Sequence, residues 1–119
     1  MEAPYVVASL GACATFVLGA LGIFAPSRVA AAVGIAALGV DGRAEVRATY
    51  GGLFFALGAL CMLAQDATVF AVAGVAWMGA AGGRALSILW DRSAGPRAVA
   101  GLAVEGVIGV ALLAPQVVT

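Results

Sequence analysis

The chain has 119 residues, of which 64% are hydrophobic and only 10% charged, and its mean hydropathy is +1.12. These values lie far outside the range of soluble globular domains, so the sequence predicts one integral membrane domain. The formal net charge is zero, which argues against a nucleic-acid partner. The chain has no histidine, and this excludes histidine-ligated haem, histidine zinc sites and histidine general bases.

Residue usage also bears on the source and on redox chemistry. Lysine and asparagine are absent while Ala, Gly and Val are abundant, which is typical of a GC-rich genome and indicates a bacterial protein. The two cysteines, Cys13 and Cys61, lie in apolar runs and form no CxxC pair, so they are interpreted as small packing residues.

Four apolar segments are long enough to cross a bilayer, which takes about 20 residues per helix. The predicted spans are residues 5–24, 44–63, 67–89 and 98–113. The first is opened by Pro4 and closed by Pro26, and the Gln65-Asp66 link permits only a tight antiparallel hairpin. The predicted fold is therefore all-α, an antiparallel four-helix bundle in the membrane.

Residues 26–40 form the ambiguous segment. Ser27 can cap a helix, but the apolar run from Val29 to Leu38 would be only about 15 Å long, half the hydrocarbon thickness. This predicts a short interfacial or re-entrant helix, and the alternative is a fifth membrane span that is unusually short.

The charges predict an orientation. With four spans, the six arginines fall on or toward one side, and the other side keeps only Glu2 and Asp66. The positive-inside rule then places the arginine side in the cytoplasm of a bacterial inner membrane, with both termini in the periplasm.

Small residues predict where helices pack closely. Glycines spaced along the apolar runs allow two backbones to approach, and those assigned to helix packing are Gly11, Gly19, Gly51, Gly58, Gly101 and Gly109. Residues 16–21 and 55–60 also match at five of six positions. This match is explained either by chance in a chain rich in Gly, Ala and Leu or by an inverted repeat of the kind found in transporters.

Two charges lie deep in predicted spans. Counting about 1.5 Å per residue from the arginine side, Arg84 lies about 9 Å and Glu105 about 12 Å into the membrane. An unpaired charge at that depth costs about 3 kcal/mol, so the two are predicted to form an ion pair. Gly101 and Gly109, one turn on either side of Glu105, should leave room for the guanidinium.

A larger polar cluster is predicted around this pair. Helical spacing puts Arg43, Arg47 and Tyr50 on one face of the second span, while Trp77 shares a face with Arg84. Arg47 either joins the pair or turns to the surface together with Glu45. The cluster is either an ion pair that fixes helix register or a cytoplasm-facing pocket for an anionic headgroup, a quinone or a proton, lined by Arg47, Tyr50, Trp77, Arg84 and Glu105.

The residues 47–52, Arg-Ala-Thr-Tyr-Gly-Gly, precede a Gly-rich apolar helix; Gly83-Arg84 with Ser87 and Asp91 ends the next, and Glu105 lies in the last. This pattern resembles the uncharacterised bacterial membrane family catalogued as domain of unknown function 4345, from the first helix to Glu105. The resemblance implies about four helices and no assigned activity. A more distant similarity to DoxX-like four-helix proteins, some of which accompany quinone-linked oxidoreductases, is architectural only.

Two functional hypotheses follow. No metal-ligand set, nucleophile triad or phosphate loop can be assembled from these residues, so neither an enzyme nor a cofactor is expected. The first hypothesis is an accessory or scaffold subunit among membrane lipids, packed as a homo-oligomer or in a larger complex. The second is a small carrier or binding protein for a lipid-like, quinone or anionic ligand, using the pocket around Arg84 and Glu105.

Overall fold

The computed structural model describes residues 2–118, and for Val118 only the backbone. Helices account for nearly all of the described chain. In chain order they are α1 (Ala3–Phe24), α2 (Pro26–Val33), α3 (Gly39–Val46), the π-helical segment η1 (Arg47–Gly52), α4 (Leu53–Ala64), α5 (Ala67–Asp91) and α6 (Pro96–Val118). The segments α3, η1 and α4 run on as one helix without a break.

Four helices are long and apolar enough to cross a membrane: Ala3–Phe24, Gly39–Ala64, Ala67–Asp91 and Pro96–Val117. The chain is therefore a multi-pass membrane protein with an all-α fold, as predicted. The second of these helices begins at Gly39 rather than Ala44, because helical hydrogen bonding continues through charged residues that a hydropathy reading leaves outside the apolar band. For the same reason the third runs on to Asp91 and the fourth begins at Pro96, before Arg97; the fourth also continues beyond residue 113 because Pro115 does not end it.

The helix ends follow from local chemistry. Pro4 lies in the first turn of α1, and Pro26 begins α2 immediately after Ala25. Between α4 and α5, Gln65 adopts the left-handed conformation, with φ 47°, and the Asp66 carboxylate caps α5 by accepting from the backbone N–H groups two and three residues ahead.

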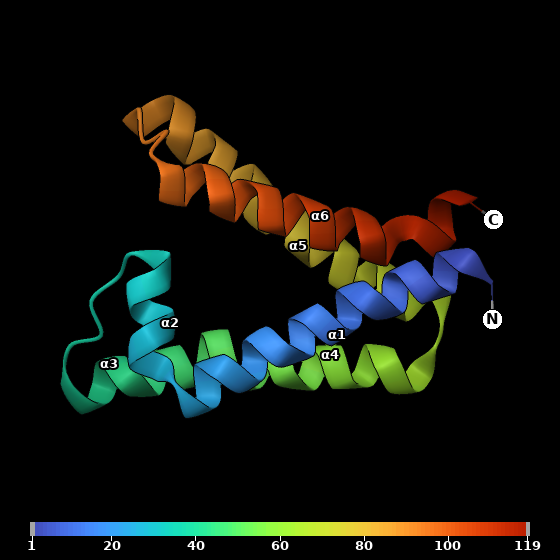
Figure 1. Ribbon diagram of the computed structural model, residues 1–119, viewed down its shortest axis with the longest axis horizontal. Coiled ribbons are helices and arrows are strands. Elements are labelled where there is room, and N and C mark those ends of the chain that lie inside the picture. The colour runs from blue at the N-terminus through green and yellow to red at the C-terminus, as the bar shows by residue number, and fades with distance from the viewer. Residues whose placement is uncertain (1, 119) are drawn as a thin grey trace.

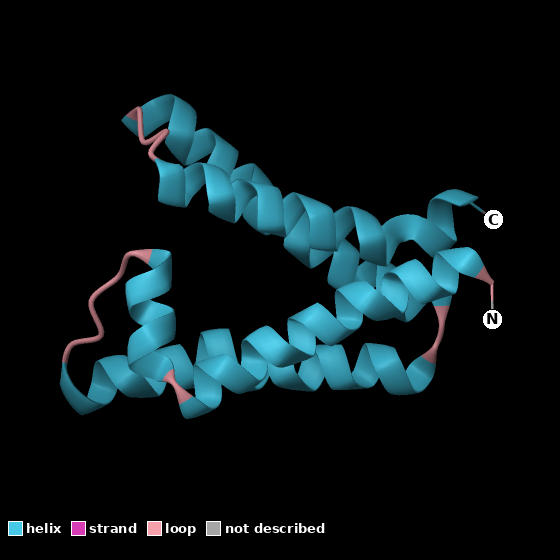
Figure 2. Ribbon diagram, in the orientation of Figure 1, coloured by secondary structure: helices cyan, strands magenta, loops and turns pink. Residues whose placement is uncertain are grey.

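The long helices form two arms that diverge like a V (Figure 1). One arm is α1 packed against α4, and the other is the α5–α6 hairpin. The arms meet at the end that holds both termini, where α1 also packs against α6. They separate toward the end that holds α2 and the longer loops, which is also where the arginine-bearing segments lie (Figure 2). The predicted charge asymmetry is thus a feature of the fold.

Within the first arm, α1 and α4 use two glycines reciprocally. A Cβ atom on Gly19 would lie 2.7 Å from the Phe55 Cα, and one on Gly58 would lie 2.8 Å from the Phe16 Cα. The aromatic rings of Phe16 and Phe55 lie beside these contacts. The two matching segments, residues 16–21 and 55–60, therefore pack against each other as antiparallel helices related by a local two-fold axis.

The core lies where the arms meet. Its buried residues are small or aromatic except for two aliphatic side chains from α6, so that the helices approach closely and the larger side chains fill the remaining space. They are Ala8, Ala12, Cys61, Phe70, Ala73, Trp77, Ile108 and Leu112. By contrast, large aliphatic side chains are exposed along all four long helices, as expected of a surface that faces lipid.

Residues 26–40 do not form a fifth span. The helix α2 has eight residues, about 12 Å, and ends at Gly34 in the left-handed conformation, with φ 80°. Irregular residues 35–38 lead from it into α3. The Arg97 side chain of α6 lies against Gly34, so α2 contacts the second arm at the open end.

Candidate functional site

Arg84 of α5 and Glu105 of α6 form the ion pair predicted from their depth. The guanidinium donates twice, from Nε to Glu105 Oε1 at 2.7 Å and from Nη2 to Glu105 Oε2 at 3.0 Å. This two-pronged geometry is the strongest that an arginine and a carboxylate can adopt. Both charged groups are thereby compensated within the membrane segment.

One of the two neighbouring glycines makes room for the guanidinium. A Cβ atom on Gly101 would lie 2.8 Å from the Arg84 Cζ, so a larger residue would displace the arginine. The same expectation is wrong for Gly109, whose open side is filled by the Met78 sulfur, 2.6 Å from an added Cβ, and by the backbone of Gly74. Gly109 is therefore a helix-packing residue and Gly101 belongs to the ion pair.

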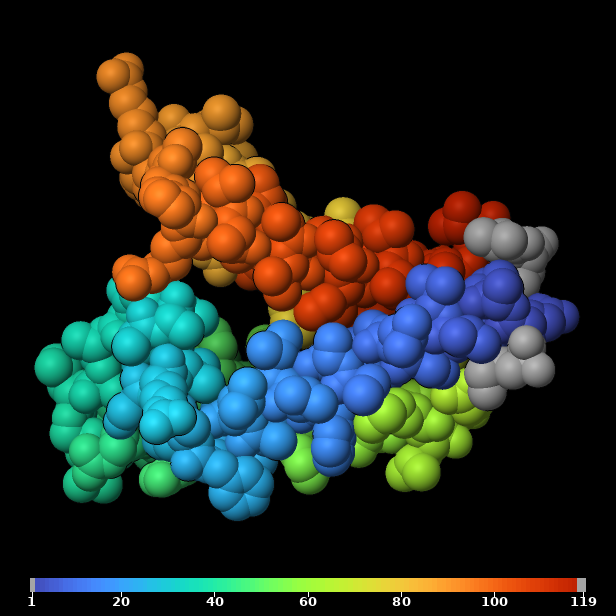
Figure 3. All heavy atoms as spheres, viewed as in Figure 1, coloured from blue at the N-terminus to red at the C-terminus, as the bar shows by residue number. Residues whose placement is uncertain are grey.

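The pair is only partly covered. The Arg84 side chain is 30% exposed and that of Glu105 is 12% exposed. The remaining guanidinium nitrogen, Nη1, has no hydrogen-bond acceptor among residues 2–118. Tyr50, from the other arm, lies within the range of charge interaction with Arg84, and no hydrogen bond joins the two among the described residues. The space-filling view shows the gap that separates α1 and α2 from the α5–α6 hairpin, which carries the ion pair (Figure 3).

Tyr50 also borders a cavity of about 270 Å³ between the loop after α2 and the first part of the second spanning helix. The wall is mostly apolar, with three polar side chains. The lining residues are Ile35, Ala36, Ala37, Gly42, Glu45, Val46, Thr49 and Tyr50. Tyr50 is thus the lining residue of this cavity that also interacts electrostatically with Arg84, and we refer to the cavity together with Tyr50, Arg84 and Glu105 as the inter-arm site.

The π-helical segment η1 explains the position of Tyr50. Its i→i+5 hydrogen bonding turns the chain through a smaller angle per residue than an α-helix does, so residues three apart no longer share a face. The expectation that Arg47 and Tyr50 lie on one face is therefore wrong. Arg47 instead donates from Nε to the Ile23 carbonyl oxygen at 2.9 Å, at the end of α1. It joins neither Arg84 nor Glu45.

Trp77 belongs to the core and not to the inter-arm site. It is 7% exposed and packs on Phe54, with ring centroids 5.0 Å apart. Its indole Nε1–H donates to Thr15 Oγ1 at 3.0 Å, and the Thr15 hydroxyl donates to the Gly11 carbonyl oxygen at 2.9 Å. Thr15 is not among the site residues predicted from the sequence, although the signal was present, because a hydroxyl in a membrane span needs a hydrogen-bond partner.

The glycines assigned to packing differ in what they contact. Gly11 faces Leu112 and the Ile108 carbonyl oxygen of α6, while Gly51 faces Ile23 on α1. A further close contact, which the sequence interpretation did not single out for packing, joins Gly74 of α5 to α6.

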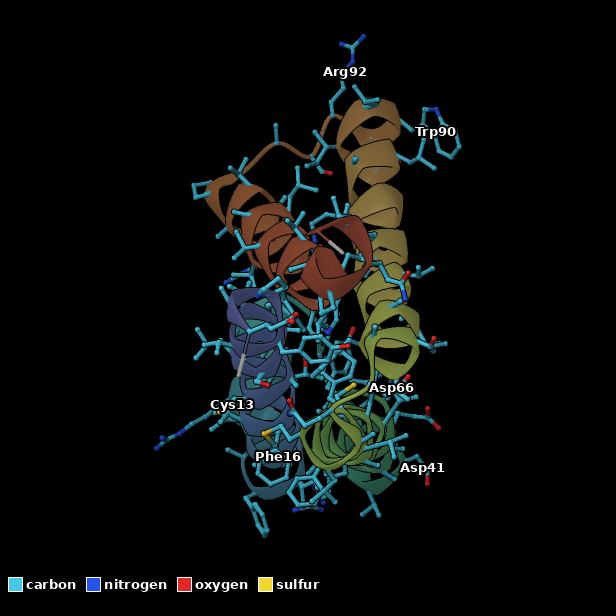
Figure 4. All side chains as sticks on the ribbon, turned by 90° about the vertical axis from the view of Figure 1, so that its right-hand side faces the viewer. Cys13, Phe16, Asp41, Asp66, Trp90 and Arg92 are labelled. Atoms are coloured by element: carbon cyan, nitrogen blue, oxygen red, sulfur yellow. The ribbon has the colours of Figure 1, made fainter. Side chains whose placement is uncertain are left out.

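The two cysteines differ in burial. Cys61 is buried, with its thiol 3.8 Å from the Val69 carbonyl oxygen, whereas Cys13 is exposed and points outward from α1, so it is not a packing residue (Figure 4). In the same view Trp90 and Arg92 point away from the body of the molecule at the open end of α5.

Comparison with known proteins gives one match. The model of a family described as "Domain of unknown function (DUF4345)" matches residues 6–116. No curated protein and no solved structure matches the chain. The matched range includes all of the second and third long helices, most of α1 and α6, and every residue of the inter-arm site. The chain therefore belongs to the DUF4345 family.

Proposed function

We propose that this protein binds an uncharged amphiphilic molecule in the inter-arm site, without converting it. The observation that carries the proposal is the pairing of Arg84 with Glu105, which leaves Nη1 without an acceptor among residues 2–118 and the Arg84 side chain 30% exposed. An oxygen atom beside Nη1 would receive a hydrogen bond from it, and the Tyr50 hydroxyl on the other arm offers a second donor to the same ligand. A quinone carbonyl or a lipid ester carbonyl has this chemistry.

The balanced charge of the site favours an uncharged ligand over an anion. Glu105 lies 2.7 Å from Arg84 and neutralises it, so an anionic group near Nη1 would also experience the carboxylate. A carbonyl oxygen accepts the same hydrogen bonds without that repulsion. The apolar wall formed by Ile35, Ala36 and Val46 offers a surface for the rest of such a molecule.

A purely structural role explains the ion pair less well. Arg84 and Glu105 join two helices that are already held together by a short connection and by packing along their length. Burying two charges costs desolvation energy, and well-packed apolar residues often hold helices equally well. Ionisable residues within membrane helices generally serve function, which supports the inter-arm site as the place of binding.

The test uses a decyl-substituted benzoquinone and the protein in detergent, with binding followed by quenching of tryptophan fluorescence. We expect saturable quenching. Tyr50→Phe removes one hydrogen-bond donor and should weaken binding by about five-fold, the equivalent of about 1 kcal/mol. Tyr5→Phe is the matched control, because Tyr5 packs against Phe70 in the core at the closed end. Its affinity should equal that of the parent protein.

A second arm tests the charge argument. Dodecyl phosphate should bind more weakly than the quinone to the parent protein, whereas Glu105→Gln, which leaves Arg84 uncompensated, should reverse this order. The proposal is contradicted if quenching does not saturate or if Tyr50→Phe and Tyr5→Phe bind the quinone equally. Thermal unfolding of each variant confirms that the fold is retained.

A second candidate function, an accessory subunit, is favoured by one observation. Gly79, Gly82 and Gly83 of α5 have no atom within 4 Å of an added Cβ, so part of this helix is open to close approach. In this proposal a second copy of the chain packs there. Light scattering should then show a dimer that Gly79→Leu converts to monomer, and a monomeric parent protein would exclude this role.

We also propose a bacterial inner-membrane location with the open end of the V in the cytoplasm. The support is the gathering of arginine-bearing segments at that end, opposite both termini. A reporter fused after Gln116 tests this: alkaline phosphatase should be active there and green fluorescent protein dark. The opposite result would reverse the orientation.

A further inference from the structure

We propose that a second hollow, where α1, α2 and α3 meet, binds the phosphate group of an anionic phospholipid. The hollow measures about 490 Å³ and is lined by residues 24–28 on one side and by Arg43 and Arg47 on the other. Together with Arg28 it contains three guanidinium groups and no acidic side chain. We refer to it as the arginine hollow; it is separate from the inter-arm site.

The helix that supplies Arg43 and Arg47 carries its basic residues on one face and its acidic residues on another. Arg43 and Arg47 are four residues apart and so lie on one face, whereas Asp41 and Glu45 are each offset from Arg43 by two residues. Accordingly Glu45 lines the inter-arm cavity and the arginines line the hollow. Within residues 2–118 the arginines of the hollow form no salt bridge, because the single salt bridge there joins Arg84 to Glu105. No carboxylate therefore neutralises the arginine hollow.

Arg47 is held in place before any ligand arrives. Its Nε donates to the Ile23 carbonyl oxygen at 2.9 Å, which fixes the plane of the guanidinium while its two Nη atoms have no acceptor among the described residues. Arginine binds phosphate oxygens through such paired N–H groups. Prior ordering of the side chain lowers the entropic cost of binding.

The surroundings favour a lipid over a free phosphate ion. Phe24, which lines the hollow, is 81% exposed and follows the exposed Leu21 on the apolar surface of α1. The polar residues Ser27 and Arg28 begin immediately beyond Pro26. The hollow thus lies at the edge of the apolar surface, where a phospholipid places its phosphate near the arginines and its acyl chains against Phe24.

The test measures lipid retention by native mass spectrometry after the protein is released from nanodiscs that contain phosphatidylglycerol and phosphatidylcholine. We expect retained phosphatidylglycerol. Arg28→Gln and Arg43→Gln should each lower its affinity by about five-fold, which corresponds to one basic residue at a membrane surface. Arg92→Gln is the matched control, because it removes one exposed arginine at the same end but outside the hollow; it should leave retention unchanged.

Each outcome of this experiment either supports or overturns the proposal. Equal losses in Arg28→Gln, Arg43→Gln and Arg92→Gln would mean a general charge effect and would overturn the proposal, as would retention that none of the three changes. Inorganic phosphate that stabilises the protein against heat to the same extent, in an Arg28-dependent manner, would reassign the hollow to a soluble anion. Arg28→Lys and Arg43→Lys should recover part of the lost retention. Tyr50→Phe should retain the lipid normally, so failure of the quinone assay leaves this result independent.

Discussion

The rings of Phe16 on α1 and Phe55 on α4 pack in a tilted arrangement with their centroids 4.3 Å apart. The Phe55 backbone lies against Gly19 of α1, and the Phe16 backbone lies against Gly58 of α4. This reciprocal contact gives the internal sequence match a physical meaning. A glycine three residues after each phenylalanine lets antiparallel backbones approach, and the rings fill the space on either side. Both copies of the motif are therefore needed for one interface.

The first prediction concerns these glycines. Gly19→Ala would bring a Cβ within 2.7 Å of the Phe55 Cα, which is backbone and cannot rotate away, so α1 and α4 must separate. We expect a loss of about 1–3 kcal/mol in unfolding free energy. Gly106→Ala, with open space around its Cβ, should be neutral or stabilising by up to about 1 kcal/mol. Unfolding of both variants in SDS titrations measures the difference, and equal stabilities would refute the close contact.

The second prediction concerns the hydrogen bond that links Trp77 to Thr15. Thr15→Val leaves the indole N–H buried without an acceptor and should cost about 1–3 kcal/mol. Trp77→Phe removes the donor together with part of the ring, whereas Thr15 keeps its bond to the Gly11 carbonyl oxygen. A double-mutant cycle should give a coupling energy of about 0.6 kcal/mol, the average for hydrogen bonds between membrane helices. A coupling of zero would show that the bond is not formed.

The third prediction concerns the space over Gly101. Gly101→Ala places a Cβ 2.8 Å from the Arg84 Cζ and should push the guanidinium away from Glu105, weakening the ion pair. Gly106→Ala, on the same helix, meets no atom within 4 Å and serves as the control. Only Gly101→Ala should change the nitrogen-15 chemical shift of the labelled Arg84 side chain. An unchanged Arg84 signal would contradict the contact.

The fourth prediction concerns the cap at the start of α5. Asp66→Ala removes the acceptor for the backbone N–H groups of Thr68 and Val69, and should cost about 1 kcal/mol. Asp41→Ala is the control, since Asp41 makes no side-chain cap for α3. Thermal unfolding followed by circular dichroism should show a lower midpoint for Asp66→Ala only.

Much of the fold could be predicted from the sequence because the governing quantities are local. Apolar length predicts the four spans, prolines predict the ends of α1, and the depth of two charges predicts the pairing of Arg84 with Glu105. The charged first turns of the second long helix were placed outside it, because hydropathy does not measure hydrogen bonding along the backbone.

The composition of the site could not be predicted in the same way. The prediction assumed regular α-helical spacing, and η1 violates this assumption at the point where it separates Arg47 from Tyr50. Trp77 shares a helical face with Arg84, yet the V-shaped divergence of the arms places Trp77 in the core and leaves Arg84 partly exposed. Angles between helices depend on packing partners that periodicity does not reveal.

The order of the helices along the chain has a consequence for biogenesis. The glycine contacts between α1 and α4 are complete by Ala64, so the first arm has both of its faces before α5 leaves the ribosome. By contrast, Arg84 emerges from the ribosome before Glu105, because 20 residues lie between the two charges in the chain. Insertion of α5 thus passes through a stage with an uncompensated charge, and the short connection to α6 limits how long the nascent chain stays in it.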